Sequence, residues 1–239
     1  MNTPFKEQNL EPVRTSGKNW SHIAILAGFA LMLCKYLIFA YSPIEAEMKL
    51  TQKIFYVHLP LAWWGLTSFF VVFAASILYL RSRNMRWDIL ALAAAEIGVL
   101  FIGLALANGA IWAKKSWNSW WIWDPRLSTT LVMWFVYMGY LALCGLDATR
   151  EKQAAIRAVV GIIAFLDVPL VFFAARLWQS NHPAGVMILR DGLEPEMRLT
   201  ILACLVAFGL FWCALLMLRC RLASLEQELD ILIRRLEEH

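Results

Sequence analysis

The stretch Ile89-Leu-Ala-Leu-Ala-Ala-Ala-Glu-Ile-Gly-Val-Leu-Phe-Ile-Gly-Leu-Ala-Leu-Ala-Asn-Gly-Ala-Ile-Trp-Ala113 has 25 residues and a single charged side chain, Glu96. A helix that crosses a bilayer needs roughly 20 consecutive apolar residues. Five further blocks of the 239-residue chain have the same character: Ile23–Tyr41, Val57–Leu80, Leu127–Leu146, Ala155–Trp178 and Leu199–Leu218. The sequence therefore predicts an all-α polytopic membrane protein with six transmembrane helices.

The composition agrees with a membrane protein. The chain is 60% hydrophobic and 17% charged, whereas charged residues usually make up about a quarter of a soluble protein. The apolar blocks are continuous, which excludes the alternating pattern of a transmembrane barrel. We divide the chain into an N-terminal segment (1–22), a six-helix membrane domain (23–218) and a C-terminal segment (219–239). The loops are too short to form a soluble domain with its own core.

Lysine and arginine are divided unequally between the two sides of the predicted bundle. The side of the N-terminus carries Lys6, Arg14, Lys18, Arg81, Arg83, Arg86, Arg150, Lys152, Arg157, Arg219, Arg221, Arg234 and Arg235. The other side carries Lys49, Lys53, Lys114, Lys115, Arg126 and Arg190. Because basic residues concentrate in cytoplasmic loops, we expect both termini in the cytoplasm. The net charge of +4 then reflects membrane topology and not nucleic-acid binding.

The C-terminal segment repeats leucine at intervals of four and three residues. The leucines are Leu218, Leu222, Leu225, Leu229, Leu232 and Leu236. This heptad spacing predicts an amphipathic helix that continues from the sixth span into the cytoplasm. Its apolar face could contact a partner or lie on the bilayer surface, and the spacing does not decide between them.

Two carboxylates lie inside predicted spans, Glu96 and Asp167. Charged groups are costly within a bilayer, so each residue either forms hydrogen bonds between helices or lines a path for protons or a ligand. Pro169 follows Asp167 closely and predicts a kink in the fifth helix, because proline removes a helical hydrogen bond.

Several kinds of chemistry are excluded by missing motifs. The cysteines are Cys34, Cys144, Cys204, Cys213 and Cys220, and no two of them form a CxxC. A covalent CxxCH heme site and a thiol–disulfide catalyst are therefore not expected. The sequence has no phosphate-binding P-loop and no recognisable set of catalytic residues. We predict a binding and transport protein and not an enzyme.

Two histidines are expected at the same depth, at the outer ends of their helices. His58 begins the second span and His182 follows the fifth. Neutral imidazoles are good axial ligands for heme iron, so this pair could complete the coordination of a flat macrocycle. The alternative is that each histidine is an interfacial residue satisfied by water or a backbone carbonyl.

The predicted outer loop at 112–126 is unusually rich in tryptophan. It contains Trp112, Trp117, Trp120, Trp121 and Trp123. Tryptophan commonly anchors helices at the membrane interface, but a belt needs only one or two residues per helix end. So dense a cluster is suited to a flat hydrophobic ligand. The neighbouring Lys114, Lys115 and Arg126 are placed to meet carboxylates such as heme propionates.

These residues also resemble a known family. The segment Trp117-Asn-Ser-Trp-Trp-Ile-Trp-Asp124 is similar to the WWxWD signature of the heme-handling proteins of cytochrome c maturation. Its continuation, Asp124-Pro-Arg-Leu-Ser128, resembles the form found in the CcmC type. The segment Ile54-Phe-Tyr-Val-His-Leu-Pro60 is similar to that family's first histidine motif. Asn118 stands where glycine is common in the family.

The resemblance implies a site and a function. His58 and His182 would be the axial ligands of the iron of a non-covalent heme b. The remaining heme-binding residues would be Trp117, Trp120, Trp121, Trp123, Asp124 and Arg126. The chain would lie in a bacterial inner membrane with its heme site facing the periplasm. It would deliver heme to a CcmE-like periplasmic chaperone, in a complex with subunits like CcmA, CcmB and CcmD.

Two other functions remain open on sequence alone. A heme lyase of the CcsA or CcmF type would join heme to a CxxCH motif itself. The modest size of the chain and the Asp124–Ser128 continuation argue against such an enzyme. A secondary transporter without heme would use its tryptophans only as membrane anchors.

Overall fold

The computed structural model of the chain describes residues 19–46, 48–177 and 193–237. Regular structure within these residues is helical, apart from one isolated bridge between Glu45 and Lys49. Six stretches are long and apolar enough to cross a membrane: Trp20–Tyr41, Leu50–Ser82, Met85–Trp117, Pro125–Gly145, Arg150–Ala174 and Pro195–Glu226. The prediction of an all-α protein with six candidate spans is confirmed.

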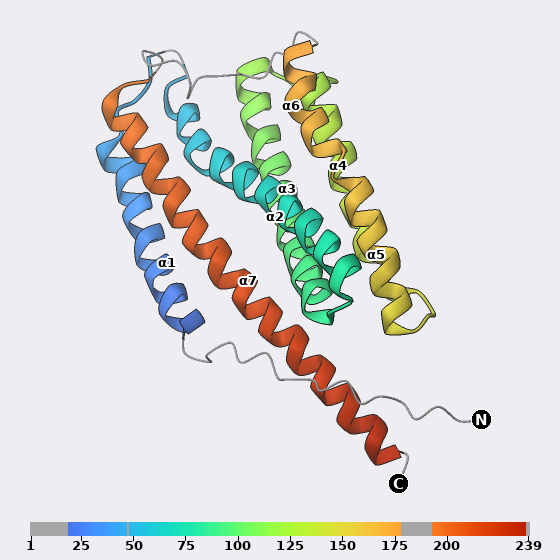
Figure 1. Cartoon of the computed structure of the whole chain (residues 1–239). Helices are drawn as coiled ribbons and strands as arrows, with labels where there is room; N and C mark the ends of the chain where they lie inside the picture. The colour runs from blue at the N-terminus through green and yellow to red at the C-terminus, as the bar shows by residue number, and fades with distance from the viewer. Residues whose placement is uncertain (1–18, 47, 178–192, 238–239) are drawn as a thin grey trace, which may run out of the picture.

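Ten helical elements make up these spans. They are α1 (Asn19–Tyr36), the π-helical turn η1 (Leu37–Tyr41), the 3₁₀ turn η2 (Leu50–Ile54), α2 (Phe55–Ser82), α3 (Met85–Trp117), α4 (Pro125–Ala142), the 3₁₀ turn η3 (Leu143–Gly145), α5 (Arg150–Ala164), α6 (Asp167–Leu177) and α7 (Pro195–Glu237). The α3–α4 loop and the starts of α2 and α7 lie at one end of the bundle, here named the loop end (Figure 1). The start of α1 and the α2–α3 and α4–α5 connections lie at the opposite end.

The fifth span is broken into two helices. α5 ends at Ala164 and α6 begins at Asp167, after a turn at Phe165 and Leu166. The cause is Pro169, whose ring clashes with the carbonyl four residues earlier, that of Phe165, and which lacks the N–H that would bond to it. The predicted kink is therefore present. The Oδ2 atom of Asp167 is buried beside this break and has no hydrogen-bond partner among the described residues.

The centre of the bundle is the close pairing of α2 and α3, which glycines permit. A Cβ atom at Gly65 would lie 2.7 Å from the side chain of Ile102, and one at Gly98 would lie 2.6 Å from Phe69. Phe69 in turn stacks on Tyr137 of α4, with ring centroids 3.5 Å apart. The small residues thus let α2, α3 and α4 share one buried core.

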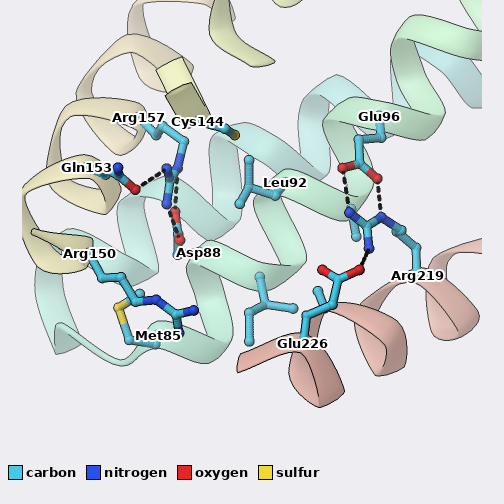
Figure 2. Close-up of a pocket in the computed structure, with 13 residues that line it drawn as sticks. Met85, Asp88, Leu92, Glu96, Cys144, Arg150, Gln153, Arg157, Arg219 and Glu226 are labelled. Carbon is cyan, nitrogen blue, oxygen red and sulfur yellow. Dashed lines mark hydrogen bonds and ion pairs between the residues drawn. The ribbon is translucent and has the colours of Figure 1, made fainter. Parts of the chain in front are cut away.

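Two ion pairs fasten α3 to its neighbours (Figure 2). The carboxylate of Asp88 accepts hydrogen bonds from the guanidinium of Arg157 on α5 at 3.1 and 2.6 Å, and both side chains are buried. Glu96 pairs with Arg219 of α7, and one of the two contacts measures 3.0 Å. The ion pairs border a cavity of about 330 Å³ between α3, α5 and α7. Glu96 therefore joins two helices, as the first of its two interpretations required.

α7 carries the leucine repeat without a break. It runs from Pro195 to Glu237 as a single helix and projects beyond the other helices at the opposite end (Figure 1). The exposed leucines of the repeat are Leu222, Leu225, Leu229, Leu232 and Leu236. The expected helical continuation is present. No other described residue buries these leucines.

Candidate functional site at the loop end

The start of α2 is anchored before His58 is reached. The ammonium of Lys53, which is buried, donates hydrogen bonds to the carbonyls of Ile38 at 2.5 Å and Ser42 at 3.4 Å. The hydroxyl of Tyr56 bonds to the hydroxyl of Ser42. Buried ammonium groups need such partners, so these contacts fix η1, which continues α1, against η2 and the start of α2. His58 is consequently held at a defined height, one turn into α2.

His58 itself faces α3. Its Nδ1 atom lies 3.1 Å from the carbonyl oxygen of Ala105. The ring lies over Gly109, where an added Cβ would be 3.2 Å from the His58 Cε1 atom. Arg126, at the start of α4, lies within electrostatic range of both His58 and Asp124. The structure thus places the charge of Arg126 within electrostatic range of His58 and Asp124, two other predicted site residues.

The tryptophan-rich loop begins where α3 ends. Asn118 follows Trp117 in the left-handed conformation, with φ of 55°. Asparagine tolerates this conformation better than other residues with a side chain, so it can stand at a position where the resemblance leads us to expect glycine. The ammonium of Lys114 donates to the carbonyl and the side-chain oxygen of Asn118 at 3.3 and 3.2 Å. Lys114 therefore caps the helix end.

The tryptophans of the loop differ in exposure. Trp120 is 60% exposed and Trp123 is 81% exposed. Trp121 is partly buried and packs edge-to-face against Trp123, with centroids 5.9 Å apart. Trp117 packs in the same way on Trp112 at 5.0 Å. Trp120 and Trp123 are therefore not part of the buried core. Their aromatic surface is available to a ligand, a partner or the membrane.

Asp124 ends the loop and starts α4. Its carboxylate accepts a hydrogen bond from the backbone N–H of Arg126 at 2.9 Å, and Pro125 occupies the first helical position. This is the usual N-cap arrangement followed by proline. Asp124 is also buried. Asp124 and Pro125 therefore give the fourth span a rigid start, and Arg126 is held at its N-terminus.

One predicted site residue lies outside the described part of the chain. His182 lies within 178–192, outside the described residues, so its pairing with His58 stays a prediction. Residues that sequence reasoning missed are Ala105 and Gly109, which contact His58. Asn108, next to Gly109, has a buried side-chain oxygen without a partner among the described residues. Ala105 and Gly109 lie four residues apart and therefore on one face of a helix. This spacing is the only feature of the sequence that could have linked them.

The fold and site define a class: a polytopic membrane protein of six candidate spans that presents a histidine and an exposed tryptophan-rich loop at one end of the bundle. A family model described as heme exporter protein C matches residues 8–235. The chain belongs to this heme exporter protein C, or CcmC, family.

Curated relatives agree with this assignment. Heme exporter protein C of Rhodobacter capsulatus is 30% identical over 216 residues, which cover 88% of this chain and 89% of the relative. The protein of that name from Haemophilus influenzae is 27% identical over 191 residues, or 79% and 78% of the two chains. A putative cytochrome c biosynthesis ccmC-like mitochondrial protein of Marchantia polymorpha is 26% identical over 194 residues, or 80% and 82%. The predicted resemblance to the CcmC type is confirmed.

Proposed function

We propose that this chain binds heme b non-covalently at the loop end and delivers it to a CcmE-like periplasmic chaperone for cytochrome c biogenesis. The observation that carries the proposal is the position of His58. Its imidazole is fixed against α3, while Trp120 and Trp123 of the adjoining loop remain exposed. The names of the relatives, heme exporter and cytochrome c biosynthesis protein, support the choice of ligand.

Each residue has a role in this proposal. His58 and His182 are the axial ligands, and the indole rings of Trp117, Trp120, Trp121 and Trp123 provide the apolar surface for the macrocycle. Arg126 neutralises a propionate, because guanidinium binds carboxylate strongly. Asp124 keeps Arg126 and the loop in place through the α4 N-cap.

The orientation follows from the basic residues. With the loop end outside, both termini and the C-terminal part of α7 lie in the cytoplasm, on the side richer in lysine and arginine. The heme site then faces the periplasm of a bacterial inner membrane. Subunits like CcmA, CcmB and CcmD are the proposed partners. The exposed leucine face of α7 is available to them on the cytoplasmic side.

A purified sample tests the central claim. We expect the protein from heme-replete cells to show non-covalent heme b in a pyridine hemochrome spectrum. His58→Ala should lower heme content per folded molecule and chaperone loading, because one axial bond is lost. His22→Ala is the matched control, since His22 is exposed on the first helix near the opposite end. Heme-free parent protein, or equal loading by His58→Ala and the parent, contradicts the proposal.

The tryptophan surface has its own test. Trp120→Ala and Trp123→Ala should lower heme content or chaperone capture, while Trp→Phe at the same positions is milder because an aromatic face remains. Trp20→Ala, at the start of α1, serves as the matched control for an interfacial tryptophan at the opposite end. If the loop variants lose protein from the membrane yet load heme normally per molecule, the tryptophans act as anchors only.

A further inference from the structure

The contact between His58 and Ala105 determines which ring nitrogen carries the proton. A backbone carbonyl oxygen only accepts hydrogen bonds. The Nδ1 atom of His58, 3.1 Å from the Ala105 oxygen, must therefore be the donor. In the neutral ring this places the lone pair on Nε2.

We infer that the Ala105 carbonyl and Gly109 form a positioning element that holds His58 in its Nδ1–H tautomer and directs Nε2 toward the bound metal. This inference rests on the proposed function, because it assumes that the ligand of His58 is heme iron. Ala105 and Gly109 act through His58 and do not themselves touch the heme.

The helical register of α3 explains why two residues act together. Within an α-helix the Ala105 carbonyl already accepts from the N–H of Gly109, four residues later. A carbonyl oxygen has a second lone pair, which His58 uses. To reach it, the ring must pass over position 109, where an added Cβ would lie 3.2 Å from Cε1 and 3.6 Å from Nδ1. Glycine leaves the space that this approach requires.

The arrangement has consequences for metal binding. A histidine ligand that donates its other N–H to a carbonyl is fixed in tautomer and ring orientation, and its basicity rises. The opposite tautomer would lose the bond to Ala105 and place a hydrogen on Nε2, where iron must bind. The element therefore prepares His58 for the iron before heme arrives and reduces the reorganisation that binding requires.

The tautomer is measured directly in the heme-free protein. Histidine labelled with ¹⁵N, at an alkaline pH where the ring is neutral, gives different nitrogen shifts for the two tautomers. The His58 signals are assigned by their disappearance in His58→Ala. We expect the Nδ1–H form for His58. A dominant Nε2–H form overturns the inference.

Gly109→Ala tests the element in a variant that should fold. Alanine favours helix over glycine, so the change does not weaken α3 as a helix, and heme is measured per folded molecule. We expect the Nδ1–H population to fall and the heme content to drop several-fold, with loss of low-spin character in the absorption spectrum. Gly139→Ala, where an added Cβ meets nothing within 4 Å, should match the parent.

The outcomes separate this inference from the proposed function. If His58→Ala loses heme while Gly109→Ala keeps both the parent's tautomer and its heme content, the positioning role is wrong and the function stands. If His58→Ala leaves the heme spectrum unchanged, the proposed ligand is wrong, and with it the purpose assigned to Ala105 and Gly109.

Discussion

Asp124 shows how a single residue in a signature motif can serve the fold as well as the ligand. Its carboxylate caps α4 by accepting from the Arg126 N–H at 2.9 Å, and it interacts electrostatically with the Arg126 guanidinium. Capping α4 needs only a side-chain oxygen at this position. The electrostatic interaction with Arg126 needs the negative charge of the carboxylate.

Two substitutions separate these tasks. Asp124→Ala removes the cap and should lower the free energy of unfolding by about 1 kcal/mol. Asp124→Asn keeps a capping oxygen and should stay near the parent in stability, since asparagine is an equally good N-cap. Thermal unfolding in detergent measures the stability, and the hemochrome spectrum measures heme per folded molecule. If Asp124→Asn is as unstable as Asp124→Ala, the charge and not the cap stabilises the loop.

At the scale of the elements, the α2–α3 pair depends on close backbone approach. Gly98→Ala places a Cβ 2.6 Å from the Phe69 ring and 2.9 Å from the Ser68 Cβ atom. Both neighbours are buried, so the helices must move apart. We expect the free energy of unfolding to fall by about 1–3 kcal/mol, the usual cost of overpacking, as measured by unfolding in detergent. Gly139→Ala serves as control, and equal stability of the two variants would contradict the tight pairing.

The two ion pairs that fasten α3 should differ in importance. Asp88→Ala leaves Arg157 buried without its partner and should cost about 3–5 kcal/mol. Glu96→Ala should cost less, because Arg219 is not left unpaired: it keeps Glu226 as a partner at 3.4 Å. The measurement is again unfolding in detergent.

A double variant checks the reason for that difference. Replacing Asp88 and Arg157 together by leucine removes the unpaired charge along with the pair. We expect Asp88→Leu/Arg157→Leu to recover much of the stability that Asp88→Ala loses. If it does not, the single variant fails for loss of packing and not for a buried charge.

At the scale of the whole molecule, the proposed orientation makes opposite ends of the bundle accessible from opposite compartments. Cys144 is exposed in η3, at the end assigned to the cytoplasm. In a variant whose other cysteines are replaced, a membrane-impermeant maleimide should label Cys144 only after the membrane is permeabilised. Ser116→Cys, exposed near the end of α3, should be labelled in intact spheroplasts. The reverse pattern would invert the topology.

The sequence by itself determined the features that depend on contiguous residues. The number of spans follows from the length of apolar runs, the break in the fifth span from Pro169, and the start of α4 from Asp124 and Pro125. The tryptophan motif also identified the loop and the family, because its residues are adjacent in the chain. His58 was found for the same reason, as part of a local motif.

The tertiary structure alone decided which residues surround His58 and which carboxylates pair with which arginines. Ala105 lies 47 positions from His58, and Arg219 lies 123 positions from Glu96. In a soluble helix, an apolar stripe indicates the buried face. In a membrane, lipid and neighbouring helices are both apolar, so the sequence pattern does not reveal how each helix is rotated. The contact of His58 with Ala105 and Gly109 depends on that rotation and on the close crossing of α2 and α3.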